Sequence, residues 1–334
     1  MMRSMTLGGA VLVAVLWALP AAAQLPDAKA LLGDVGFSAD QVQQVTSGEI
    51  VRGAIQAASE RELVVALAFQ VGTTPAKLVA DLKAGLGIKV DPGTLSSGVF
   101  SGTGSTADLA GLALDPDGQK RAKAYVNAQP GGDLNLSTQE YATFNALGPS
   151  QEAVTPAVQA ALLARMQAYQ KQGLAGIAPY ALGDGKTRSA ADELRTATQA
   201  SKALQKFIPA AYQMLLDYPS AKPAGTEEVF RWAQIDAHGV PTFTLTHAAF
   251  VPDGDAYFVV QRMFYVSSGF NAEQAIAAVL PVQGGSVVVY ANRTSTDQVT
   301  GWGGSVKRSI GSELLESQLE ALFQKARAAV SPAG

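Results

Sequence analysis

The side chains that proteins use for acid–base and metal chemistry are scarce in this sequence. It has two histidines, His238 and His247, and no cysteine. Without cysteine there can be no thiol nucleophile, iron–sulfur site, cysteine-bound zinc or disulfide framework. The two histidines do not lie in a zinc-binding HExxH motif. We therefore expect neither a metal ion nor another cofactor.

Of the two histidines, His247 is the candidate for a functional role. In the run 241–251, every second residue should lie on the same face of a strand, and His247 shares that face with Phe243 and Leu245. Its side chain should therefore point toward a core or a cavity. The ordinary interpretation is a buried, neutral histidine with a hydrogen-bond partner. The functional interpretation is a general base or a group that orients a ligand. His238 lies in a predicted turn, where we expect it to be exposed.

A second polar group consists of Arg293 and Asp297, which follow an apolar run and lie four residues apart. An arginine at the end of a strand can bind a ligand carboxylate through two hydrogen bonds. The ordinary interpretation is a structural Arg–Asp pair that holds the turn before the last helix. If His247 and Asp297 met at a common point, they could serve a hydrolase-like or cyclase-like enzyme. We otherwise predict no catalytic residue.

These residues are carried by a series of strands with turns between them. The runs are apolar and rich in β-branched residues, and Asp253-Gly254 and Gly284-Gly285 are typical of tight hairpin turns. In 256–266 both alternate faces are largely apolar, so we expect a central strand covered on both sides. Arg262 within it should extend to the sheet edge or pair with an acid. The predicted strands are 229–236, 241–251, 256–266 and 286–292.

The segment 271–282 allows two interpretations. Its alanine, glutamate and glutamine favour a helix capped by Asn271. A hairpin at Gly284-Gly285 instead requires 276–282 to be a strand, which is the interpretation we adopt. The last element, 311–329, has leucines at helical spacing, acidic residues early and basic residues late. That order complements the helix dipole and predicts an amphipathic helix.

The N-terminal part adds two strands, at 49–55 and 61–71, and a helix that begins at Pro75. Residues 86–111 are rich in Gly, Ser and Thr and indicate a loop. Helical patterns then follow as far as residue 219, interrupted by an irregular apolar loop. The strongest helix is predicted at 155–172 and the loop at 173–185.

Residues 1–23 have the order of a secretory signal. Arg3 precedes an apolar run, and Ala21-Ala22-Ala23 forms a small-residue cleavage site. The alternative is an uncleaved membrane anchor, but the apolar run is too short and poorly flanked for a lasting membrane span. No later stretch is long and apolar enough to span a bilayer. The formal net charge is −3 without a basic stripe, which argues against nucleic acid as a partner. We expect an exported, soluble protein, periplasmic or secreted.

Two stretches, 48–79 and 228–329, resemble the START/Bet v1-like, or helix-grip, superfamily. Within the second, the segments 247, 264–265, 290–297 and 307–308 look similar to a group of uncharacterised exported bacterial proteins. The likeness covers about half of the chain, and residues 85–225 are longer and more helical than the superfamily usually inserts. The resemblance implies an apolar cavity between sheet and C-terminal helix that holds a lipid, sterol or similar molecule. It implies a cavity and not a reaction.

We therefore predict an α+β fold in which a curved antiparallel sheet packs on a long C-terminal helix. Its parts are a signal peptide (1–23), N-terminal strands and helix (24–84), a large helical insertion (85–225) and a β-meander with the last helix (226–330). The leading prediction for function is binding of an apolar small molecule or lipid. The alternatives are an interaction or structural module with a filled core, and the enzyme with His247 and Asp297. The predicted ligand-binding residues are Phe243, Leu245, His247, Phe258, Met263, Tyr265, Arg293 and Asp297.

Overall fold

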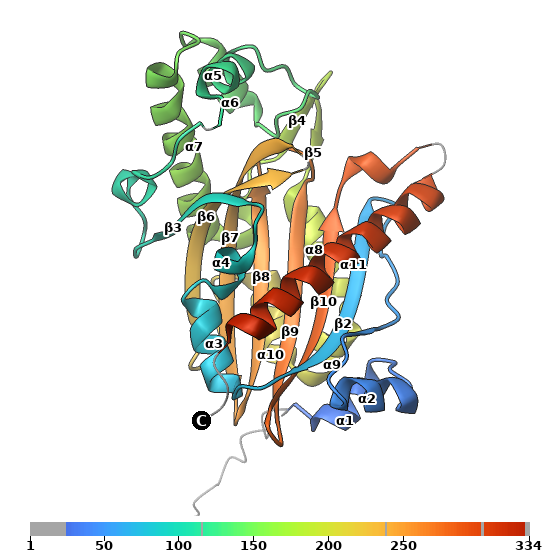
Figure 1. Ribbon diagram of the computed structural model, residues 1–334. Coiled ribbons are helices and arrows are strands. Elements are labelled where there is room, and N and C mark those ends of the chain that lie inside the picture. Colours follow the sequence, from blue (N-terminus) through green and yellow to red (C-terminus); the bar gives the residue numbers. More distant parts are fainter. Residues whose placement is uncertain (1–24, 115, 238, 302–303, 331–334) are drawn as a thin grey trace, which may run out of the picture.

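The computed structural model describes residues 25–114, 116–237, 239–301 and 304–330. One antiparallel sheet organises them (Figure 1), with its strands in the order β1-β2-β10-β9-β8-β7-β6-β3. The α+β class is therefore confirmed. The strands are β1 Val51–Arg52, β2 Glu62–Val71, β3 Thr94–Phe100, β6 Glu227–Ala237, β7 Val240–Asp253, β8 Ala256–Val266, β9 Ala272–Val282 and β10 Gly285–Ser295.

The five strands β6 to β10 are consecutive neighbours and form the predicted meander. The strand interpretation of 271–282 is confirmed, because β9 lies between β8 and β10. The turn from β9 to β10 uses Gly284 at φ 80° and Gly285 at φ 150°. A Cβ atom on Gly285 would overlap the backbone oxygen of Val71, so only glycine fits where β10 begins to pair with β2.

The N-terminal strands join the same sheet, as predicted. β2 pairs with β10 along ten residues, from Glu62 opposite Ser295 to Val71 opposite Ser286. The strand predicted at 49–55 is reduced to the two residues of β1.

The prediction of a loop at 86–111 is wrong, because this segment contains α4 (Leu86–Val90) and the edge strand β3. The serines and glycine of β3 are poor strand formers. Gly98 is required because a Cβ there would overlap the indole ring of Trp232 on β6.

One face of the sheet is covered by α3 (Pro75–Lys83), α4 and α11 (Gly304–Ala329), which crosses the front of Figure 1 as a long diagonal helix. The predicted C-terminal helix is thus confirmed, and it begins seven residues earlier than predicted. Phe323 of α11 packs between Phe69 and Tyr290, with ring centroids 4.8 Å apart in both pairs.

The opposite face carries the remaining helices and a small hairpin. Tyr169 of α7 (Gln151–Gln172) stacks on Phe264 of β8 with ring centroids 4.1 Å apart, and the helices between residues 118 and 217 share one apolar core with the sheet. The helices between residues 28 and 46 pack on the sheet in a second cluster. The prediction of a loop at 173–185 is wrong in its second half, where residues 180–183 form strand β4. The α-helices are α1 Ala28–Asp34, α2 Ala39–Thr46, α5 Gly118–Val126, α6 Thr138–Asn145, α7 Gln151–Gln172, α8 Ala190–Ala200, α9 Lys202–Phe207 and α10 Pro209–Asp217. The hairpin is β4 Tyr180–Gly183 with β5 Lys186–Arg188, and short 3₁₀ turns lie at Thr106–Leu109, Gly173–Gly176 and Asp297–Val299.

The helix ends follow local sequence signals. Helix α7 begins four residues before the predicted start at Thr155, because the Ser150 side chain caps it by accepting a hydrogen bond from the Ala153 amide. Ser189 caps α8 in the same way. Across the described ranges, no helix is long and apolar enough to cross a membrane. The predicted signal peptide and His238 lie outside the described residues.

Candidate functional site

His247 lies in a buried polar cluster and is 1% exposed. A carboxylate only accepts hydrogen bonds, so Nε2 donates to Glu228 Oε1 at 2.9 Å, and Nδ1 accepts from the Tyr169 hydroxyl at 3.1 Å. Burial lowers the pKa of His247 despite the neighbouring carboxylate. Burial would raise the pKa of Glu228, but hydrogen bonds from His247 and Lys222 outweigh it and lower that pKa to about 2. His247 is thus a buried, neutral histidine with two partners.

The other predicted residues near His247 are also core residues. Phe243, Leu245 and Tyr265 are buried beneath the helices of the second face. The Arg165 guanidinium lies over the Tyr265 ring at 4.2 Å. These three side chains pack in the filled core and line neither of the two hollows described below. Met263 is half-buried and also lies outside the lining of both hollows.

Arg262 does not reach the sheet edge, and the prediction that it does, or that it pairs with an acid there, is wrong. Its side chain is fully buried and donates to neutral acceptors, which include Gln274 Oε1 at 2.7 Å and the Leu215 backbone oxygen at 2.9 Å. Helices α8 and α10 cover this part of β8 and supply acceptors that strand alternation alone cannot show.

The expected pair between Arg293 and Asp297 does not form. Arg293 Nη1 donates instead to Glu62 Oε2 at 2.7 Å, because both lie on the face of the sheet opposite α11. Asp297 lies beyond the end of β10, where it accepts from Arg61 Nε at 2.8 Å and from Arg188 Nη2 at 2.9 Å. His247 and Asp297 have no hydrogen-bond partner in common, so they form no shared acid–base site.

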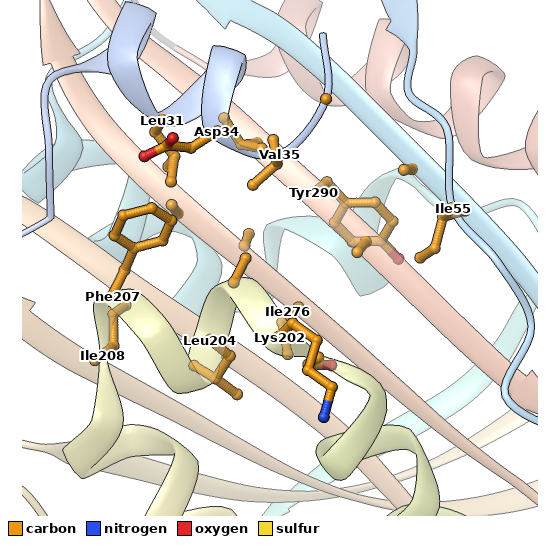
Figure 2. Close-up of a pocket in the computed structure, with 18 of the residues that line it drawn as sticks. Leu31, Asp34, Val35, Ile55, Lys202, Leu204, Phe207, Ile208, Ile276 and Tyr290 are labelled. Carbon is orange, nitrogen blue, oxygen red and sulfur yellow. The ribbon is translucent and has the colours of Figure 1, made fainter.

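An apolar hollow of about 520 Å³ lies on this same face of the sheet. Its floor consists of small and branched side chains of β2, β9 and β10, among them Ala66, Ile276 and Ala291. Figure 2 shows Leu31 and Val35 on one side and Leu204 and Phe207 on the other. Segments that lie far apart in the sequence thus meet around one apolar space.

Polar groups of the apolar hollow lie at its ends. The ion pair of Arg293 with Glu62 closes one end, and Asp34 and Lys202 lie at the exposed rim. Tyr290 contributes its backbone, since its ring points to the other face and contacts Phe323.

Of the eight predicted ligand-binding residues, Phe258 and Arg293 line the apolar hollow. Sequence reasoning missed the small residues of its floor. Alanines of β9 such as Ala278, together with Ala66 and Ala291, leave space on a sheet face where larger side chains would fill it. The alanines of β9 are also the residues that made 271–282 resemble a helix. In a strand, small side chains on one face instead indicate unfilled space above the sheet.

A second hollow, of about 380 Å³, lies beyond the ion pair of Arg293 with Glu62. All of its lining residues are polar: Ser59, Arg61, Glu62, Thr187, Arg188, Ser189, Asp192, Glu193, Thr196 and Ser295.

Glu193 is the unusual member of this polar hollow. Its Oε1 accepts from the Asn271 amide at 3.2 Å, and its Oε2 is buried without a hydrogen-bond partner among the described residues. Burial raises the pKa of Glu193 to about 7, against the opposing effects of Asn271 and Arg188. Perturbed carboxylates of this kind gather at functional sites.

No group of three or more His, Cys, Asp or Glu side chains within the described ranges is arranged to hold a metal ion. In comparisons with known proteins, no family model and no curated protein matches the chain.

Proposed function

We propose that the protein binds an apolar small molecule or lipid in the apolar hollow. The observation that carries this proposal is the hollow itself, whose volume of about 520 Å³ lies within the range of about 300–1,000 Å³ typical of ligand sites. Half-buried apolar residues such as Ile276 and Val289 form its floor. Covering them with an apolar ligand gains about 25 cal/mol for each Å² removed from water.

The buried charges of the apolar hollow favour a ligand whose inserted part carries no net charge. Arg293 is already neutralised by Glu62 at 2.7 Å. A charged group that reached this end of the hollow would have to separate the pair, and breaking a buried pair is costly. A hydroxyl or carbonyl group can accept a hydrogen bond from Arg293 without that cost. The charges of Asp34 and Lys202 lie at the exposed rim and do not restrict the inserted part.

We infer a helix-grip-like relationship from the order of the elements, in which a strand pair precedes an antiparallel meander and a C-terminal helix. That resemblance supports ligand binding in general. The apolar hollow lies on the sheet face opposite α11, whereas the resemblance implies a cavity between sheet and C-terminal helix. The location of the proposed site therefore rests on the hollow and not on the resemblance. The export of the protein is likewise a proposal, which rests on the signal-like order of residues 1–23.

Both alternative functions have less support. A structural module with a filled core predicts no hollow near the lower limit of about 300 Å³ for ligand sites, and the apolar hollow exceeds it. An enzyme that uses His247 and Asp297 requires the two side chains to converge, and they have separate partners.

The test is native and denaturing mass spectrometry of the protein purified through its own export route. We expect an added apolar mass that is lost on denaturation. Ala291→Trp, which fills the floor of the hollow, should abolish it, and Ala160→Trp, an identical change at an exposed position of α7, should not. A protein that purifies without such a mass, and then binds no member of a panel of a long-chain alcohol, a sterol and a diacylglycerol, would refute the proposal.

A further inference from the structure

The polar hollow has one positive and one negative side. The positive side consists of Arg61, which precedes β2, and Arg188, which ends β5. Both guanidinium groups bind the same carboxylate, that of Asp297. Arg61 donates through Nε alone, and no described residue accepts a hydrogen bond from its two Nη groups. The two guanidinium groups therefore share the Asp297 carboxylate and still have N–H groups that can donate to a second anion.

The negative side is the first turn of α8. Asp192 and Glu193 both line the hollow, and Asp192 is exposed. Glu193 Oε2 is buried without a partner among the described residues. The nearest cation, Arg188, is 3.9 Å from the carboxylate and is itself bound to Asp297 at 2.9 Å. The Glu193 carboxylate thus lacks the full neutralisation that buried acids usually have.

The charges of the hollow cancel when Glu193 is protonated, and they leave one net negative charge when it is ionised. Glu62 is neutralised by Arg293, and the two remaining arginines exceed Asp297 by one positive charge. Asp192 and Glu193 supply up to two negative charges on the other side. A simple anion would be attracted by one side and repelled by the other, and so would a simple cation. A ligand with separated charges of both signs matches the hollow best.

We propose that the polar hollow is a second binding site, which takes the zwitterionic group of a free amino acid. The ligand carboxylate would bind the N–H groups of Arg61 and Arg188, because guanidinium groups match carboxylates in geometry and charge. The ligand ammonium would lie beside Asp192 and Glu193. The volume of about 380 Å³ leaves room for a polar side chain against Ser59, Thr187 and Thr196.

Binding of this ligand near neutral pH should release a proton. The raised pKa of Glu193 means that part of the population carries a proton there at pH 7, and an adjacent ammonium favours the ionised form. The other charged groups facing Glu193 are Asp192 on its own helix, Arg188 from β5, Glu62 from β2 with Arg61 before it, and Asp297 after β10.

The experiment is isothermal titration calorimetry with L-serine, L-asparagine and L-glutamine. Each titration is done at neutral pH in two buffers that differ in heat of ionisation, which measures the protons released. We expect at least one amino acid to bind with proton release. Two analogues of L-serine serve as controls: ethanolamine lacks the carboxylate, and 3-hydroxypropionate lacks the ammonium group. Both should bind much more weakly than L-serine. Absence of binding by all three amino acids, or equal binding of either analogue, would overturn the proposal.

Two variants identify the groups involved. Glu193→Gln keeps the oxygen that accepts from Asn271 and should abolish proton release and weaken binding about tenfold or more, as expected for loss of a charged hydrogen-bond partner. Arg61→Gln, at a side chain 43% exposed, should weaken binding similarly without affecting the fold. Glu313→Gln, an exposed glutamate of α11, is the matched control. Binding unchanged in both variants would locate the amino acid elsewhere and refute the site.

The amino-acid site and the apolar site can fail separately. Ala291→Trp fills the apolar hollow and should leave amino-acid binding unchanged. Glu193→Gln should leave the co-purifying apolar mass unchanged.

Discussion

Replacing Glu193 with glutamine should make the protein more stable at neutral and alkaline pH. The carboxylate is 14% exposed, and one of its oxygens is buried without a hydrogen-bond partner among the described residues. Glutamine keeps the oxygen that accepts from Asn271 and removes the buried negative charge. Most substitutions at buried positions destabilise a protein, so an increase in stability on replacing Glu193 would be informative.

The size of the effect follows from the pKa of Glu193. It rises from 4.5 to about 7 on folding, and at about 1.4 kcal/mol for each pKa unit the ionised side chain costs the folded state about 3 kcal/mol. Because the folded pKa is the higher one, the folded state binds more protons and stability falls as pH rises. The cost is absent below pH 4.5, grows up to about pH 7 and is constant above it.

The assay is urea unfolding at several pH values between 5 and 8, followed by tryptophan fluorescence. The stability of Glu193→Gln minus that of the wild type should rise from near zero at the acidic end to about 2–3 kcal/mol at the alkaline end, the lower value allowing for the buried amide. Glu313→Gln should differ from the wild type by less than about 0.5 kcal/mol at every pH, as surface substitutions usually do. A difference for Glu193→Gln that does not change with pH would refute the reasoning, whatever its size.

Three further predictions concern the folded state, each measured by urea unfolding. Because burial lowers the pKa of His247, the wild type should lose stability relative to His247→Gln as pH falls below 6.5; a constant difference from pH 7 to 5 would contradict the neutral histidine. Gly173 has φ 58°, and a Cβ atom there would overlap the Tyr218 backbone oxygen, so Gly173→Ala should reduce the free energy of unfolding by about 2–4 kcal/mol. Gly148 has open space around it, so Gly148→Ala should cost almost nothing. Equal costs for the two variants would contradict the steric argument. Arg165 is buried and donates to Glu140 at 2.6 Å, so Arg165→Met should cost about 3–5 kcal/mol by leaving that acid unpaired. Adding Glu140→Gln should then recover part of the loss, and no recovery would show that the pair is not the cause.

The sheet could be predicted from the sequence wherever alternation was strong. Residues 61–71 and the runs 229–236, 241–251 and 256–266 place large apolar side chains at every second position, and a period of two is typical of strands. Strand β3 could not be predicted, since Ser96, Ser97 and Gly98 carry no such pattern. It is a strand because β6 offers it an open edge and Trp232 needs a glycine opposite, and both conditions are tertiary.

The candidate sites were less accessible to sequence reasoning. The alternating pattern correctly predicted that His247 and Leu245 lie on a covered face of the sheet. It could not show that the helices between residues 118 and 217 fill the space above them. Arg293 does pair with a carboxylate, but the partner is Glu62 and not the predicted Asp297. The sequence could not show this, because Glu62 is distant along the chain and lies beside Arg293 only in the folded sheet. Glu193 carried no signal at all, since its perturbation arises from segments that meet only in the folded chain.

The ion pair of Arg293 with Glu62 has a consequence for how the two hollows behave together. Arg293 lines the apolar hollow, Glu62 lines the polar one, and the two side chains are 2.7 Å apart. A molecule that drew Arg293 toward one side would change the charge that the other side presents. For such a molecule the linkage would be reciprocal: each occupant would alter the affinity for the other by the same factor, and a coupling of about 1.4 kcal/mol would make that factor ten. The protein would then respond to one class of molecule according to the supply of another.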